Sequence, residues 1–182
     1  MHKMTAANLR NAHGGESMAH QRYLIWGAEA EREGLPNIAR LFRAIASAET
    51  VHATNHFRQL KDEGGDFLCA SMAVFGLKDT SSNLQGGIDG ETYEIEEMYP
   101  AYLEEAKFQQ EKGAELSFRY AISAEKEHAA LFKKAKAAVD AGKDVELGPV
   151  RVCRVCGWTH EGDIPDKCPI CGATRDKFQS FE

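Results

Sequence analysis

The sequence predicts an all-α four-helix bundle, followed by a small metal-binding domain of short strands and turns. Between residues 5 and 141, apolar side chains recur at every third or fourth position, which is the period of an amphipathic helix. Beyond residue 148 this period ends, and two Cys-x-x-Cys pairs lie among glycines and prolines. We therefore expect two unequal domains in this chain of 182 residues, at positions 1–147 and 148–182.

Four segments carry the helical period. They are expected at residues 5–32, 36–63, 90–112 and 114–141. Pro36 suits the first turn of the second segment, whereas Pro100 is expected to kink or break the third. Residues 66–89 contain turn-forming residues and are long enough to cross the bundle, so this connection should join two helical hairpins. A short linker at residues 143–150 leads to the cysteine-rich domain.

Charge and apolar content argue against several classes of protein. Acidic residues outnumber basic ones by 28 to 22, and nucleic-acid binders usually carry a clustered basic excess instead. No run of 18 apolar residues occurs, so we expect no membrane span, and residues 1–10 lack the apolar segment of a signal peptide. A cytoplasmic location is therefore expected. The isolated Cys69 is expected to be a small, at least half-buried apolar residue.

Carboxylates interrupt the apolar faces of the predicted helices. The buried face of the second helix is predicted to contain Ile38, Phe42, Ile45, Glu49, His52 and His56. The same spacing places Glu16 on the first helix face and Glu125 with His128 on the fourth, and the third helix adds Glu91 and Glu94. An isolated buried carboxylate is costly, so several that converge need a shared cation. A metal ion can supply that charge.

The spacing of these residues is more specific than their number. Two Glu-x-x-His motifs begin at Glu49 and Glu125, and each places a carboxylate and an imidazole one helical turn apart on the same side. Ferritin-like di-iron bundles combine two such pairs with a single glutamate from each of the other two helices. Glu16 and Glu91 fit the single-glutamate roles. A lone Glu-x-x-His is common on solvated surfaces, but two pairs on predicted core faces favour a di-iron site with Glu49 and Glu125 as bridging ligands.

The chain also contains an internal repeat. Gly-Glu-Ser at residues 15–17 recurs as Gly-Glu-Thr at residues 90–92, and the Glu-x-x-His motif recurs with an offset that is longer by a single position. Two similar hairpins would relate the two metals by a pseudo-two-fold axis. The symmetry fails at Glu94, whose counterpart in the first half is Ala19. One metal should therefore have an additional carboxylate nearby, which makes the two metals inequivalent.

Other polar residues lie beside this pattern. His20 and His56 are expected to be surface groups or to contact the ligands without binding metal. Tyr23, Tyr93 and Tyr99 are close in sequence to candidate ligands, and each phenol either hydrogen-bonds a ligating carboxylate or simply packs in the core.

Four cysteines indicate a second metal site. Cys153, Cys156, Cys168 and Cys171 form two pairs of the kind that hold a metal in a tetrahedral sulfur cage. Each pair is followed by glycine, which permits the tight turn that directs backbone amides at sulfur. Zinc and iron both suit this geometry, and structural zinc is the commoner case. The neighbouring di-iron site favours iron, because a centre that cycles between oxidation states needs a supply of electrons.

In this order and spacing, the motifs resemble the rubrerythrin family. They are Gly-Glu-Ser at 15–17, Glu49-x-x-His52, Gly-Glu-x-x-Glu at 90–94, Met98-Tyr99-Pro100, Glu125-x-x-His128 and the cysteine-rich tail. The resemblance implies a ferritin-like bundle that binds two irons and a rubredoxin-like domain that binds one iron through four cysteines. It implies seven catalytic metal ligands in the bundle: Glu16, Glu49, His52, Glu91, Glu94, Glu125 and His128. The first iron would exchange His52 for Glu94 as it is oxidised.

The same resemblance implies a peroxidase that reduces hydrogen peroxide to water in defence against oxidative stress. Its electrons would come from a donor protein, either rubredoxin or an NAD(P)H-dependent reductase, through the rubredoxin-like iron. It further implies a homodimer in which that iron lies near the partner subunit's di-iron centre.

Two other functions remain open from the sequence. The bundle can be a ferroxidase or a dioxygen-reducing centre, because relatives of the same fold carry out such reactions. Alternatively, zinc occupies the cysteine site and the protein has a structural or metal-carrying role without catalysis.

Overall fold

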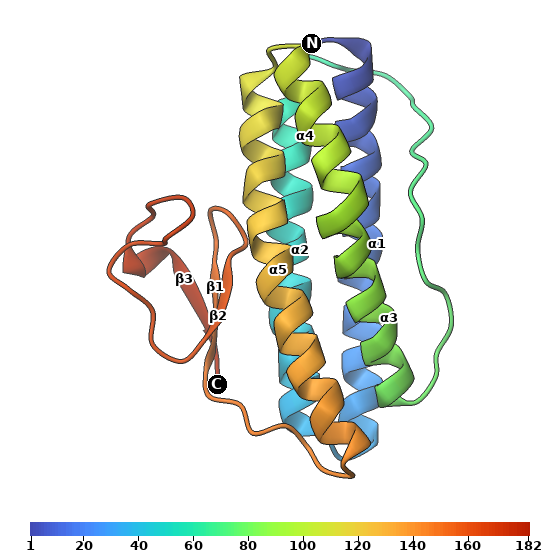
Figure 1. The fold of residues 1–182 in the computed structure, drawn as a ribbon, viewed down its shortest axis with the longest axis vertical. Helices are drawn as coiled ribbons and strands as arrows, with labels where there is room; N and C mark the ends of the chain where they lie inside the picture. The colour runs from blue at the N-terminus through green and yellow to red at the C-terminus, as the bar shows by residue number, and fades with distance from the viewer.

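A computed structural model describes residues 1–182 and confirms an all-α bundle with a small cysteine-rich domain beside it (Figure 1). The helices are α1 (Lys3–Arg32), α2 (Pro36–Gln59), α3 (Thr80–Tyr93), the π-helical turn η1 (Glu94–Met98), α4 (Tyr99–Phe108) and α5 (Lys112–Asp140). α3, η1 and α4 follow one another without a break and form a single rod of the bundle. None of the helices has the length and apolar character that crossing a membrane requires.

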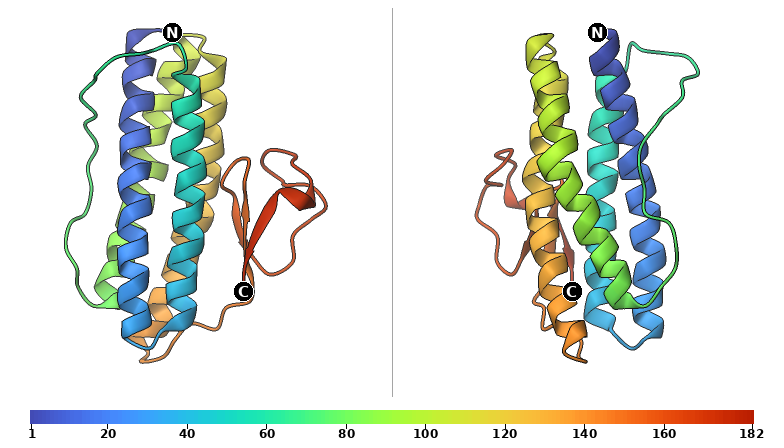
Figure 2. Two further views of the ribbon diagram at one scale, coloured as in Figure 1. Left: turned by 180° about the vertical axis from the view of Figure 1, so that it is seen from behind. Right: turned by 45° about the vertical axis from the view of Figure 1, so that its right-hand side comes forward.

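The connection between α2 and α3 crosses the bundle as expected. It runs along the outer side of α1 from one end of the bundle to the other (Figures 1 and 2). Cys69 lies in this connection and is exposed, so the expectation that it is buried was wrong. The reason is that this connection runs over the surface of the helices, and no further segment covers it.

The third helical rod begins at Thr80 rather than at residue 90, so the predicted start was wrong. Asp79 caps this helix, because its carboxylate accepts a hydrogen bond from the Ser82 N–H at 2.7 Å. Gly86 and Gly87, which suggested a loop, lie inside α3 for a packing reason. A Cβ added to Gly86 or Gly87 would lie 3.0 Å from an aromatic ring of α1 or α5, respectively. Glycine therefore permits close contact between the helices.

The other helix ends differ from the expected ones by smaller amounts. α2 stops at Gln59 rather than at residue 63, while α1 and α5 each begin slightly before the predicted starts, at Lys3 and Lys112. Such differences are normal where a helix frays into a turn.

Pro100 neither breaks nor ends the third rod, because a π-helical turn precedes it. The Tyr99 N–H bonds to the Glu94 carbonyl five residues back, which widens the helix and adds one residue to that turn. This insertion accounts for the change in the offset of the internal repeat. Glu91 precedes the π-helical turn, and Tyr99 follows it. The offset between Tyr99 and its counterpart Tyr23 is one position longer than the offset between Glu91 and its counterpart Glu16.

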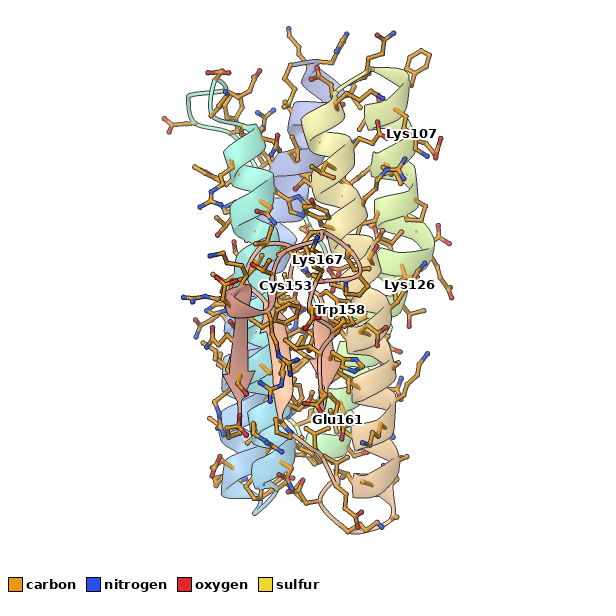
Figure 3. The ribbon with its side chains drawn as sticks, turned by 90° about the vertical axis from the view of Figure 1, so that its left-hand side faces the viewer. Lys107, Lys126, Cys153, Trp158, Glu161 and Lys167 are labelled. Carbon is orange, nitrogen blue, oxygen red and sulfur yellow. The ribbon has the colours of Figure 1, made fainter.

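The tail is a three-stranded antiparallel sheet with strand order β2-β1-β3. Its strands are β1 (Val150–Cys153), β2 (Thr159–Glu161) and β3 (Phe178–Phe181), with a short 3-10 turn at Arg175–Lys177 before β3. The sheet lies over α2 and α5 near the middle of the bundle (Figure 3). Val145, Val150 and Val152 belong to the same apolar core as the bundle, so the tail is packed against the helices rather than tethered beside them.

The packing of α3 yields a stability prediction. We expect Gly87→Ala to lower the midpoint of urea unfolding, because the new methyl group meets the buried Phe132 ring at 3.0 Å. Phe132 is held between the Tyr23 and Phe42 rings, each 5.2 Å away between centroids, and cannot move aside. Overpacking of this kind costs about 1 to 3 kcal/mol, which exceeds the gain of about 1 kcal/mol from replacing a helical glycine.

Gly90→Ala is the matched control on the same helix, since nothing lies within 4 Å of its added Cβ. It should raise the midpoint or leave it unchanged. If Gly87→Ala stabilises the protein as much as Gly90→Ala, the packing explanation is wrong.

Candidate metal centres

The bundle brings six of the predicted ligands together in two overlapping clusters at its centre. One cluster contains Glu16, Glu49, His52 and Glu125, and the other contains Glu49, Glu91, Glu125 and His128. Within each cluster the candidate ligand atoms all lie within 4.8 Å of one another. All six residues are buried, and each of the four helical rods contributes at least one.

Glu49 and Glu125 each face both imidazoles. The His52 Nδ1 atom lies 2.9 Å from Glu49 Oε2 and 2.9 Å from Glu125 Oε1. The His128 Nδ1 atom lies 3.3 Å from Glu49 Oε1 and 2.6 Å from Glu125 Oε2. The two oxygens of each carboxylate therefore point toward different histidines, which is the arrangement that two bridged metals require.

The oxygen and nitrogen atoms of the two clusters are placed to bind metal ions rather than to hydrogen-bond with one another. Several have no hydrogen-bond partner although they are fully buried: Glu16 Oε2, Glu49 Oε1, Glu91 Oε2, both Glu125 oxygens and His128 Nδ1. Buried polar atoms without partners are rare in folded proteins unless an ion or water binds them. Four buried carboxylates carry the charge that two divalent cations neutralise.

The electrostatics of the cluster lead to the same conclusion. Burial, together with the neighbouring carboxylates, raises the pKa of Glu16 and of Glu91 well above the usual value. Burial alone would lower the pKa of His52 and of His128, but the surrounding glutamates raise both values. Burial alone would raise the pKa of Glu125, but the two imidazoles lower it. Cations bound among these groups would therefore displace protons from them.

Glu94, the seventh predicted ligand, lies outside both clusters. It begins the π-helical turn and lines a cavity of about 230 Å³, which is also bordered by Arg22, Tyr93 and Ser71 from the crossing connection. Burial of the Glu94 carboxyl group raises its pKa well above the usual value. His52 thus belongs to the first cluster, whereas Glu94 borders a space that a small molecule can enter.

Two of the three candidate tyrosines bond to the cluster. The Tyr23 hydroxyl donates to Glu91 Oε1 at 2.7 Å, and the Tyr99 hydroxyl donates to Glu16 Oε1. Tyr23 and Tyr99 occupy equivalent places in the internal repeat, a signal that was available in the sequence. Tyr93 is 44% exposed and lines the cavity instead.

The two neighbouring histidines have different roles. His56 is buried and outside the clusters, with Nε2 3.0 Å from the Tyr99 hydroxyl and Nδ1 2.8 Å from Ser117 Oγ. Burial lowers the pKa of His56 to about 3, so the ring is neutral and supports Tyr99. His20 bonds to the Ala46 carbonyl at 2.8 Å, on a groove between α1 and α2 that is separate from the clusters. Ser117 carried no sequence signal.

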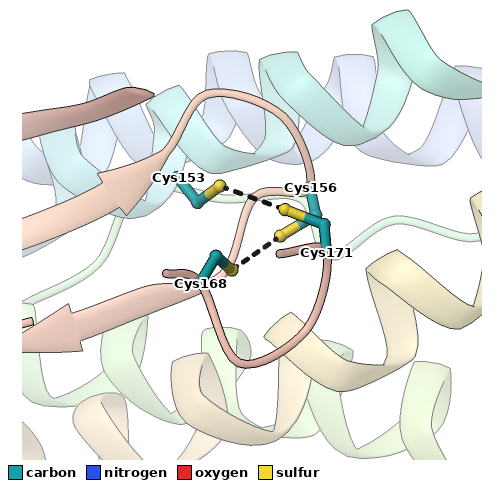
Figure 4. Close-up of side chains that lie close together, drawn as sticks. All are labelled: Cys153, Cys156, Cys168 and Cys171. Atoms are coloured by element: carbon teal, nitrogen blue, oxygen red, sulfur yellow. Dashed lines mark hydrogen bonds between the residues drawn. The ribbon is translucent and has the colours of Figure 1, made fainter. Parts of the chain in front are cut away.

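The four cysteines of the tail converge as the sequence predicted (Figure 4). The Sγ atoms of Cys153 and Cys171 are 3.6 Å apart, and those of Cys156 and Cys168 are 3.5 Å apart. The glycines that follow each pair, Gly157 and Gly172, have φ of 82° and 75°, a conformation that favours glycine. A hydrogen bond from the Cys156 thiol and backbone N–H groups lower the pKa of Cys153 to about 5, which favours the thiolate that binds metal.

The turn at residues 153–157, called the cysteine knuckle below, and the strand β2 that follows it lie against the histidines of the bundle. A Cβ added to Gly157 would lie 2.0 Å from His52 Nε2, so only glycine allows this approach. His128 Nε2 lies 2.9 Å from Thr159 Oγ1, and Asn55 Nδ2 donates to the Val155 carbonyl at 2.9 Å. These contacts are made within one chain, and the approach between two subunits that the family resemblance implied stays a prediction. The sequence did not indicate Thr159.

Comparison with known proteins identifies the family of both parts of the chain. A family model described as rubrerythrin matches residues 7–136, and one described as the rubredoxin-like domain of rubrerythrin matches residues 152–179. Rubrerythrin-2 of Clostridium acetobutylicum is 53% identical over 98% of this chain and 97% of its own length. Nigerythrin of Nitratidesulfovibrio vulgaris is 32% identical over 97% of this chain and 86% of its own length.

A solved structure described as fully reduced, all-ferrous nigerythrin superimposes with a TM-score of 0.85. It is 32% identical and covers 97% of this chain and 86% of the other. The cofactors of the present chain are accordingly two irons in the bundle and one iron at the four cysteines. With both domains matched in order over nearly its whole length, the chain belongs to the rubrerythrin family.

Proposed function

We propose that this protein is a non-haem di-iron peroxidase that reduces hydrogen peroxide to water with electrons relayed through the four-cysteine iron. The observation that carries the proposal is the contact of the tail with His52, through Gly157, and with His128, through Thr159. A four-sulfur iron site next to a buried two-metal site suits electron delivery. Both metal sites that the proposed relay uses lie in one chain.

The number of electrons that a two-iron site can hold matches the reduction of peroxide to water. When bound, two ferrous ions would supply the two electrons that convert hydrogen peroxide and two protons to two waters. The chain has the same bundle donors that ferritin-like di-iron proteins use: Glu16, Glu49, His52, Glu91, Glu125 and His128. We assign these six as ligands and Glu94 as a seventh that takes part after oxidation.

Glu94 has a second role in the proposal. Its carboxyl group lines a cavity that a small oxidant can enter, and burial raises its pKa, which favours the protonated form. It therefore holds a proton where the departing oxygen of peroxide needs one. Loss of that proton would leave a carboxylate that could join the residues that hold the first iron. The position of His52 in the cluster, with Glu94 outside it, corresponds to the reduced arrangement expected from the family resemblance.

Rapid mixing of the ferrous protein with peroxide or dioxygen tests the oxidant. We expect peroxide to oxidise the bundle irons much faster than dioxygen does. Glu94→Gln should slow the peroxide reaction by about 100-fold or more, because it removes the acid. Glu97→Gln is the control, since Glu97 lies on the same π-helical turn but is exposed.

Equal rates with the two oxidants would overturn the peroxidase assignment. Uptake of many irons per chain, rather than three, would favour a ferroxidase linked to iron storage.

Metal binding should release protons and weaken as the pH falls. The pKa values of Glu16, Glu91, His52 and His128 are raised in the folded protein, so these groups hold protons that a cation must displace. Lower pH fills these positions with protons more completely, and higher pH empties them. Calorimetric titration with Fe²⁺ in anaerobic buffers of different ionisation enthalpy measures the number released. A titration that releases no protons would contradict the ligand assignment.

The relay predicts different effects for two similar substitutions. Gly157→Ala should slow electron transfer from the cysteine iron to the bundle, because its Cβ would lie 2.0 Å from His52 Nε2 and the knuckle must move away. Gly172→Ala introduces similar backbone strain at φ 75°, but nothing lies within 4 Å of its Cβ. Reoxidation of the reduced cysteine iron by peroxide, followed by its visible absorption, measures the transfer. Equal slowing in both variants would place the relay elsewhere.

A further inference from the structure

Thr159 makes a buried contact between the tail and the bundle. Its Oγ1 atom lies 2.9 Å from His128 Nε2, and both residues are fully buried. The same oxygen donates a hydrogen bond to the Gly157 carbonyl at 3.0 Å. Thr159 opens β2, where it pairs with Val152 of β1, so its backbone is fixed by the sheet. Its branched side chain has few rotamers, which fixes the hydroxyl as well.

The direction of these hydrogen bonds follows from the cluster. His128 Nδ1 faces the carboxylates Glu49 and Glu125, where a metal binds. The ring proton is therefore on Nε2, which donates to Thr159 Oγ1. Thr159 in turn donates its own proton to the Gly157 carbonyl, so each group in the chain from His128 to the knuckle is satisfied.

His52 lacks an equivalent partner. Its Nδ1 faces Glu49 and Glu125 in the same way, but its buried Nε2 atom has no hydrogen bond. Nε2 lies against the backbone of Gly157, which packs on the ring without holding it. The same segment of the tail thus touches both histidines and bonds to only one through a side chain.

We propose that Thr159 is a positioning residue that fixes His128 on the second metal, while His52 remains free to leave the first. Hydrogen bonds to the distal nitrogen of a ligating histidine orient the ring and increase its basicity. The tail therefore increases the metal affinity of the bundle, in addition to its proposed role in supplying electrons. The proposal rests on the two-metal site and not on the identity of the oxidant, so it stands or falls separately from the peroxidase assignment.

Binding of Co²⁺ to the bundle, with iron retained at the cysteines, tests the proposal. Thr159→Val keeps the shape and removes the hydroxyl, and we expect it to weaken one of the two bundle sites by about 10- to 100-fold. Thr159→Ser keeps the hydroxyl and should bind within about twofold of the natural protein. Thr174→Val makes the same chemical change at an exposed position of the tail and should have no effect. Unchanged affinity in Thr159→Val, or equal weakening in Thr159→Ser, would overturn the proposal.

A second measurement needs no variant. In the Co²⁺-loaded natural protein, proton NMR detects the shifted Nε2–H signals of the two ligating histidines. We expect the His128 proton to exchange slowly with solvent, because Thr159 accepts it, and the His52 proton to exchange faster. If the His52 proton is the protected one, or if neither is protected, Thr159 does not hold His128.

Discussion

Four glutamates and two histidines lie together at the centre of the bundle, where no water can solvate their charge. Burying such groups is costly unless cations balance them, and two divalent ions balance four carboxylates. The rest of the structure supplies what those cations require. Each helical rod contributes a glutamate, Glu49 and Glu125 span both metal positions, and Tyr23 and Tyr99 bind the outer oxygens of Glu91 and Glu16. The apolar core packs around these side chains and leaves them almost entirely buried.

The two metal positions share a repeat but not an environment. Beyond Glu91, Tyr23 is enclosed by the rings of Phe42 and Phe132, whereas beyond Glu16, Tyr99 contacts the neutral His56. The π-helical turn exists in the second half alone and places Glu94 beside the cavity. The side of the first metal contains polar groups and the additional carboxylate of Glu94. It also contains His52, whose Nε2 atom has no hydrogen bond. The two clusters therefore differ in their surroundings, and the additional carboxylate and the cavity lie on one side only.

Much of this could be predicted from the sequence, because helical periodicity depends on local spacing. The stripe that contains Glu49 and the repeat that contains Glu125 identify core-facing ligands without any tertiary information. The start of α3 was mispredicted, because Gly86 and Gly87 suggest a loop until their contacts with Trp26 and Phe132 are known. Thr159 carried no signal for a similar reason. Its importance depends on a contact with a residue 31 positions away, across a domain boundary.

That contact changes how the tail should be regarded. A relay module needs only to bring its iron close to the bundle, and many surfaces would do that. Here Gly157 allows the knuckle to reach His52, and Thr159 places a hydroxyl against His128. Val150 and Val152 extend the apolar core of the helices into the sheet. Because the tail covers the distal nitrogens of both histidines, it completes the environment of the metal ligands. Removing it would therefore expose the distal nitrogens of both histidines in addition to taking away the four-cysteine site.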